Sequence, residues 1–168
     1  IELDKKNALI IGYGGVGRAL ASKALGFGMR VSVVDNKKVR INSSIEKIFL
    51  FDEIEVAIKN KDIIFIACPY TNLTHKLFDN EFIRKLKKDS ILINISRGGI
   101  IDTNSLVKAL EDNYFLGVGL DVTDPEPLPK KHKLNFFDRV VITPHIAGIS
   151  DKFDTRNYKL IKNNIGRY

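Results

Sequence analysis

The hydrophobic positions of the chain fall into short continuous runs that are separated by polar, helix-forming segments. Runs of roughly four to eight apolar residues are typical of strands buried on both faces. They predict strands near residues 7–11, 30–34, 62–66, 90–95, 115–121 and 139–143. The segments between and after them predict helices near 15–26, 52–59, 79–86, 103–112 and 150–166. This alternation predicts a doubly wound α/β fold with a mainly parallel sheet and right-handed crossovers.

Local signals mark some ends of these elements. Asp102 and the three residues after it offer side-chain caps to the helix that contains Leu106 to Leu110. Asp52 offers the same kind of cap to the helix predicted after it. Three prolines between Asp124 and Pro129 exclude a helix or a central strand, so this segment is predicted to be a stiff loop. Residues 36–50 have no clear period and predict no element.

The first predicted strand runs directly into a G-x-G-x-x-G sequence formed by Gly12, Gly14 and Gly17. Gly12 allows a tight turn, Gly14 lets the backbone approach a pyrophosphate, and Gly17 lets helix and strand pack closely. The helix that follows offers free N–H groups and a partial positive charge to phosphates. Asp35 ends the second strand about 20 residues downstream, where an acid holds a ribose 2′-hydroxyl. The order of these features favours a dinucleotide site over an ordinary glycine-rich turn.

Composition and charge narrow the class of protein. The 168 residues, 44% hydrophobic and 28% charged, suit one globular domain with a sizeable core. The net charge of +7 is spread over scattered lysine pairs, which favours a solvated surface over a nucleic-acid interface. No apolar run approaches the ~20 residues of a membrane span. The single cysteine, Cys68, excludes an internal disulfide and fits a reducing compartment, so we expect a cytoplasmic protein.

Polar side chains follow four of the predicted strands. Because open α/β sheets bind ligands beyond the carboxyl ends of their strands, Arg97, Glu126 and His145 are expected to face one crevice. A guanidinium can hold a substrate carboxylate and polarise a carbonyl. A histidine can exchange a proton with the carbonyl oxygen, and a neighbouring glutamate favours the imidazolium. This set suits the reduction of a 2-keto acid.

These sequences resemble the D-isomer-specific 2-hydroxyacid dehydrogenases, a family that includes phosphoglycerate, glycerate/hydroxypyruvate and D-lactate dehydrogenases. The resemblance runs through Gly12–Gly17 with Asp35, Cys68-Pro69 with Thr71 and Thr74, Leu92–Gly98, Gly119–Pro127 and Thr143–Gly148. It implies that Arg97, Glu126 and His145 are the catalytic residues and that NAD is the cofactor. It implies an NAD site made of Gly12, Gly14, Gly15, Val16, Gly17, Asp35, Cys68, Pro69, Thr74, Ile95, Ser96, Arg97, Asp121, His145, Ala147 and Gly148.

The resemblance also implies an organisation for the whole protein. The family has a second, substrate-binding domain that is formed mostly by residues before the nucleotide fold. The chain opens on Ile1 and not on Met, so we expect it to be a piece of a longer protein. Residues 1–168 are then the NAD-binding domain, with Ile1–Asp4 and the helix at 150–166 near the two crossings to the substrate domain. The resemblance further implies a homodimer through the cofactor domains, using surface between residues 100 and 140.

The expected function is hydride transfer between NAD(H) and C2 of a small D-2-hydroxy acid or 2-keto acid, with no nucleic-acid or membrane partner. An alternative is an NAD(H)-sensing, corepressor-like protein, which would keep the same three residues but bind partner peptides with little turnover. Formate dehydrogenases of the same superfamily are a weaker alternative, because they carry glutamine where Glu126 stands.

Several smaller expectations concern specificity and side-chain roles. Asp35 should repel a 2′-phosphate and favour NAD over NADP, although Lys37 and Lys38 lie close enough to soften this preference. The resemblance places Asp121 near the nicotinamide carboxamide. Cys68 is expected to be a small apolar group on the adenosine side and not a nucleophile. His75 and His132 are expected at the surface. No close-spaced set of ligands predicts a metal site.

Overall fold

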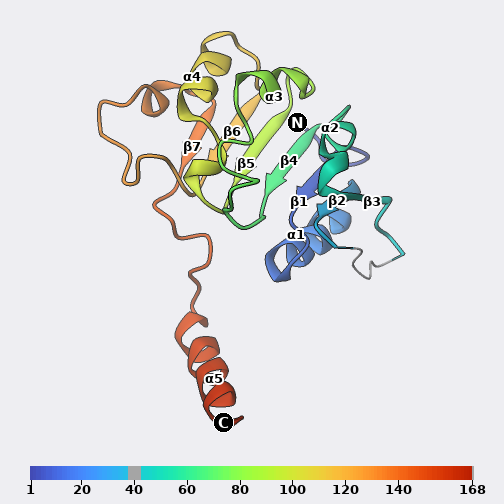
Figure 1. The fold of residues 1–168 in the computed structure, drawn as a ribbon, viewed down its shortest axis with the longest axis vertical. Helices are drawn as coiled ribbons and strands as arrows, with labels where there is room; N and C mark the ends of the chain where they lie inside the picture. The colour runs from blue at the N-terminus through green and yellow to red at the C-terminus, as the bar shows by residue number, and fades with distance from the viewer. Residues whose placement is uncertain (38–42, 168) are drawn as a thin grey trace.

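A seven-stranded sheet in the order β3-β2-β1-β4-β5-β6-β7 forms the centre of the computed structural model, which describes residues 1–37 and 43–167 (Figure 1). All of its neighbouring strands are parallel. The strands are β1 (Asn7–Ile11), β2 (Arg30–Asp35), β3 (Lys47–Leu50), β4 (Ile63–Ile66), β5 (Ile91–Asn94), β6 (Gly117–Leu120) and β7 (Val140–Ile142). The predicted parallel, doubly wound α/β fold is therefore confirmed.

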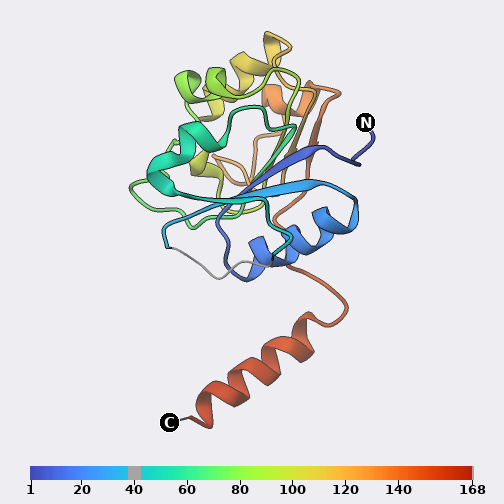
Figure 2. The ribbon, with the colours of Figure 1, turned by 90° about the vertical axis from the view of Figure 1, so that its right-hand side faces the viewer.

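Helices cover both faces of this sheet. They are α1 (Gly15–Gly26), α2 (Ile54–Ala57), α3 (Asn80–Lys85), α4 (Thr103–Glu111) and α5 (Phe153–Ile165), with short 3-10 turns η1 (Phe51–Glu53), η2 (Gly98–Ile100) and η3 (Lys133–Phe136). Figure 2 shows α1 on one face and α2, α3 and α4 on the other. Two apolar clusters correspond to these faces, a smaller one that includes Ala21 and Ala24 of α1 and a larger one that includes Phe82 of α3 and Leu106 of α4.

The structure corrects the sequence-based interpretation of residues 36–59. β3 is a short edge strand that pairs only with β2, and Phe49 is its one buried side chain. The predicted helix at 52–59 is a 3-10 turn followed by a four-residue helix. The predicted Asp52 cap is wrong, because Asp52 lies inside η1 and the Glu53 carboxylate instead accepts a hydrogen bond from Leu50 N at 2.8 Å.

The last helix stands apart from the sheet. Figures 1 and 2 show α5 at the end of an extended segment, well separated from the body of the fold. None of its residues is buried, and it exposes the apolar side chains Phe153, Tyr158, Leu160, Ile161 and Ile165. No helix within the described ranges is long and apolar enough to cross a membrane.

Candidate active site

The turn between β1 and α1 is built by close backbone contacts that only glycine permits. Gly12 has φ +95°, and a Cβ on it would lie 2.6 Å from the Cα of Cys68. A Cβ on Gly17 would lie 2.0 Å from the carbonyl oxygen of Gly12. In contrast, a Cβ on Gly14 or Gly15 would meet no atom within 4 Å, and α1 begins there without a side-chain cap. The start of α1 is therefore open at Gly14 and Gly15 and has no side-chain cap, which fits a pyrophosphate.

Asp35 closes the same turn from the end of β2. Its Oδ2 accepts a hydrogen bond from Tyr13 N at 2.7 Å, and its Oδ1 accepts one from Lys37 N at 3.3 Å. The carboxylate lines a cavity of about 300 Å³ together with Gly12, Cys68 and Pro69. An acidic group beside a glycine turn fits the ribose of a dinucleotide. The second lysine invoked in the sequence, Lys38, lies outside the described residues.

Cys68 and Thr74 also line this cavity. Cys68 packs there as a buried thiol, and Thr74 stabilises the neighbouring turn through hydrogen bonds. Burial raises the pKa of the Cys68 thiol to about 11, so it is protonated at neutral pH and unsuited to nucleophilic attack, as predicted. The buried Thr74 hydroxyl donates to the Pro69 carbonyl at 2.9 Å and accepts from Thr71 N at 2.8 Å. Thr74 thus fixes the turn that carries Pro69.

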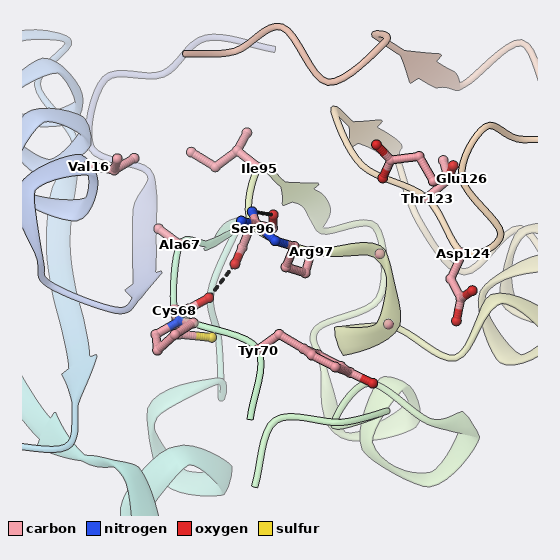
Figure 3. Close-up of a pocket in the computed structure, with 13 residues that line it drawn as sticks. Val16, Ala67, Cys68, Tyr70, Ile95, Ser96, Arg97, Thr123, Asp124 and Glu126 are labelled. Carbon is pink, nitrogen blue, oxygen red and sulfur yellow. Dashed lines mark hydrogen bonds between the residues drawn. The ribbon is translucent and has the colours of Figure 1, made fainter. Parts of the chain in front are cut away.

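A second and larger cavity, of about 850 Å³, opens on the other side of Cys68 (Figure 3). Seven predicted site residues line it, namely Val16, Cys68, Pro69, Ile95, Ser96, Arg97 and Glu126. The sequence interpretation did not include six further lining residues as site residues, namely Ala67, Tyr70, Gly98, Gly99, Thr123 and Asp124. Most of these lie inside or next to the sequences that follow β4, β5 and β6, so their neighbours in the chain were the available signal.

Arg97 is held at the end of β5 by a buried amide. The fully buried Asn94 side chain donates from Nδ2 to the Arg97 carbonyl at 2.9 Å and accepts from Ser96 N at 3.0 Å. The Ser96 hydroxyl donates to the Cys68 carbonyl, and Arg97 itself donates to the Ser96 carbonyl at 2.7 Å. Within residues 1–37 and 43–167, Arg97 forms no ion pair with a carboxylate. Its guanidinium is therefore available to an anionic ligand.

His145 and Glu126 form a hydrogen-bonded pair at the ends of β6 and β7. His145 Nδ1 lies 2.6 Å from Glu126 Oε1, and both side chains are partly exposed. His145 adopts φ +56°, and its backbone N donates to the Asp121 carbonyl at 2.9 Å. Both side chains also line a cavity of about 470 Å³ together with Asp121 and Thr143. With Nδ1 engaged by the carboxylate, Nε2 is the ring nitrogen left for a substrate.

Asp121 secures the segment that carries His145. Its buried carboxylate accepts from Ile146 N and Ala147 N, each at 2.9 Å, and from the Thr143 hydroxyl. Burial alone would raise the pKa of this carboxyl, but the hydrogen bonds from Thr143 and the two amides hold the pKa below its usual value. Its expected contact with the nicotinamide carboxamide stays a prediction.

The other predicted site residues lie around these cavities. Gly14, Gly15, Gly17, Ala147 and Gly148 line none of the three, although Gly14, Gly15 and Gly148 have open space at the Cβ position. In the part of the chain that the structure describes, no group of three or more histidine, cysteine or acidic residues is arranged to hold a metal ion.

Comparisons with known proteins agree with this geometry. The family model described as D-isomer specific 2-hydroxyacid dehydrogenase, NAD binding domain, matches residues 1–147. A glyoxylate reductase of Thermofilum pendens is 34% identical over 164 residues, which are 98% of this chain and 48% of that protein. The chain therefore spans about half the length of the curated relatives it matches.

Solved structures show the same relation. The phosphoglycerate dehydrogenase from Lactobacillus plantarum matches with a TM-score of 0.85 and 35% identity, over 99% of this chain and 54% of that one. The NAD-dependent formate dehydrogenase from Staphylococcus aureus, solved in complex with NAD, matches with a TM-score of 0.85 and 30% identity, over 99% of this chain and 49% of that one.

Proposed function

This chain belongs to the D-isomer specific 2-hydroxyacid dehydrogenase family as its NAD-binding domain, and from that premise we propose that the protein reduces small 2-keto acids to D-2-hydroxy acids. One observation carries the proposal. The Arg97 guanidinium, which forms no ion pair within the described ranges, and the His145–Glu126 pair come from the ends of β5, β6 and β7. They lie beside the glycine turn that fits a dinucleotide. This reaction needs a cation that binds the substrate carboxylate, which Arg97 can supply. It also needs a proton donor for the carbonyl oxygen, which His145 can supply.

Each residue has a distinct task in this mechanism. NAD, when bound, supplies the hydride acceptor or donor. Arg97 holds the substrate carboxylate and stabilises negative charge that develops on the carbonyl oxygen. His145 gives a proton from Nε2 to that oxygen during reduction and takes it back during oxidation. Glu126 orients the ring through Nδ1 and balances the charge of the imidazolium.

We also propose that residues 1–168 are the cofactor half of a two-domain protein. Ile1–Asp4 and α5 then lie near the crossings to a substrate domain that completes the pocket. The exposed apolar side chains of α5 and the family match to residues 1–147 support this division. A homodimer formed through the cofactor domains is part of the same proposal.

A panel of 2-keto acids with NADH, tested on the full-length protein, examines the function directly. We expect turnover with at least one acid, and a loss of about 100-fold or more in kcat for His145→Ala, the usual scale for losing a general acid. Arg97→Ala should raise KM and lower kcat, because Arg97 acts on both substrate and transition state. NADH binding without turnover of any 2-keto acid would contradict the proposal.

A further inference from the structure

The wall of the larger cavity contains a tyrosine that the proposed reaction does not use. Tyr70 and Thr71 are consecutive but line different cavities, Thr71 the one beside Asp35 and Tyr70 the one beside Arg97. Tyr70 lines the same cavity as Arg97 (Figure 3). Tyr70 is 48% exposed and is one of the residues that line this cavity. Its place is therefore on the Arg97 side, where the substrate carboxylate is expected.

Two neighbours fix the position of this ring. The Tyr70 hydroxyl lies 2.6 Å from His75 Nδ1, and the two rings meet edge to face with centroids 5.7 Å apart. The ring also packs on Gly99, where a Cβ would lie 2.9 Å from a ring carbon. A backbone hydrogen bond of 2.8 Å from Lys76 N to the Gly99 carbonyl joins the two segments. Tyr70 is thus a braced side chain, and His75, although exposed, has a specific partner.

The hydrogen bond with His75 Nδ1 leaves the Tyr70 hydroxyl able to form one further hydrogen bond with a ligand. If Nδ1 of His75 carries no proton, Tyr70 donates to it and keeps an oxygen lone pair for a ligand. If Nδ1 carries the proton, it donates to Tyr70, and the Tyr70 O–H is free to donate. A ligand hydroxyl both donates and accepts, so it can pair with Tyr70 in either state. A methyl group in the same place can do neither.

We propose that Tyr70, positioned by His75, is a specificity-determining residue that binds a hydroxyl group on the carbon next to the reacting carbonyl of the substrate. The inference rests on the proposed function and narrows its substrate class to 2-keto acids that carry a hydroxyl on C3. Arg97 holds the carboxylate at one end of such a substrate, and Tyr70 pairs with its other end.

Two isosteric substrates test the proposal on the full-length protein. Hydroxypyruvate and 2-oxobutanoate differ by a hydroxyl in place of a methyl group. Tyr70→Phe should lower kcat/KM for hydroxypyruvate about tenfold, as expected for one lost hydrogen bond, and leave kcat/KM for 2-oxobutanoate and the Kd of NADH nearly unchanged. We call the kcat/KM for hydroxypyruvate divided by the kcat/KM for 2-oxobutanoate the substrate ratio. His75→Leu should lower the substrate ratio as Tyr70→Phe does. His75→Gln should lower it less, because an amide can replace Nδ1 as a hydrogen-bonding partner.

Tyr114→Phe is the matched control. The Tyr114 hydroxyl donates to the Leu86 carbonyl at 2.7 Å, and this residue lines neither cavity, so its loss should lower stability without changing the substrate ratio. An unchanged ratio in Tyr70→Phe, or a weaker NADH affinity with an unchanged ratio, would overturn the inference. If the wild-type protein reduces no 2-keto acid of the panel, the proposed function itself fails. If it reduces other 2-keto acids but not hydroxypyruvate, the function stands and this inference falls. If the wild-type protein reduces both acids and Tyr70→Phe leaves the substrate ratio unchanged, the proposed function stands and this inference falls.

Discussion

The Asp35 carboxylate carries the choice between the two nicotinamide cofactors. Because it lines the cavity expected to hold the adenosine ribose, a 2′-phosphate would meet like charge there. We expect NAD to bind more tightly than NADP, and Asp35→Ser to weaken NAD binding about tenfold while NADP binding improves. Titration of both cofactors measures this, with Asp52→Ser as a control for the loss of an exposed acid outside this cavity. A wild-type protein that binds NADP as tightly as NAD would contradict the assignment.

Asp121 makes a pH-dependent contribution to stability. Its folded-state pKa is held below the usual value, so its stabilising effect is present above about pH 4 and is lost as the pH falls through the folded pKa. We expect Asp121→Asn to lower the free energy of unfolding by roughly 2 kcal/mol at pH 7, since hydrogen bonds to a charged carboxylate are lost.

Urea denaturation of the wild type and of Asp121→Asn at pH 7 and at pH 3 measures this difference. The gap between the two proteins should shrink at the lower pH. A gap of the same size at both pH values would mean that the charge of Asp121 contributes nothing and that only its shape matters.

Single residues also show how far the sequence could predict the site. Arg97, Glu126 and Asp35 could be proposed as site residues from their places after apolar runs, because the topology of a parallel sheet brings strand ends together. The Tyr70–His75 pair could not be found this way, since two polar residues five positions apart in a loop have no period. The full use of both Asp121 oxygens by the segment 143–147 also depends on backbone geometry that no residue pattern specifies.

At the scale of elements, the start of α4 is stabilised by its N-cap residue, Asp102. Asp102 accepts from Ser105 N at 2.9 Å and from the Ser105 hydroxyl at 2.8 Å, and these bonds together with Lys76 lower its pKa. Asp102→Ala should lower the free energy of unfolding by about 1 kcal/mol at pH 7 and by less below pH 4, because the ionised cap is lost as the carboxyl protonates. Catalytic constants should not change. Thermal or urea unfolding checks this, and an equal loss at both pH values would contradict it.

Strands that contain a run of apolar residues could be predicted from the sequence, whereas β3 and the bounds of α2 could not, because these two elements lack a clear apolar pattern. β1 and β2 lie inside the sheet and are almost fully buried, so their apolar runs are nearly continuous, and within β2 Ser32 interrupts the run. β3 has one buried side chain out of four and pairs on one side only, so nothing in its sequence demands a strand. α2 has only four residues, which is too short to display a helical period.

At the scale of the whole molecule, the proposed dimer makes a prediction about two exposed apolar residues. Phe136 and Leu116 are exposed and lie between residues 100 and 140, the region that the family resemblance assigns to the contact. We expect a dimer by light scattering at micromolar concentration, and a shift toward monomer for Phe136→Glu. Phe27→Glu, at an exposed position at the end of α1, is the matched control and should leave the assembly unchanged. A monomeric wild type would contradict the proposed dimer.

The position of β1 at the junction of the sheet has a consequence for how the protein is made. β1 pairs with β2 on one side and with β4 on the other, and about fifty residues separate its end from the start of β4. At a synthesis rate of roughly 5–20 residues per second, the backbone N–H and C=O groups on one edge of β1 stay unpaired for about 3–10 s before β4 is made. An open strand edge is a template for wrong pairing. The strand that positions the glycine turn is therefore open to wrong pairing until β4 has been synthesised.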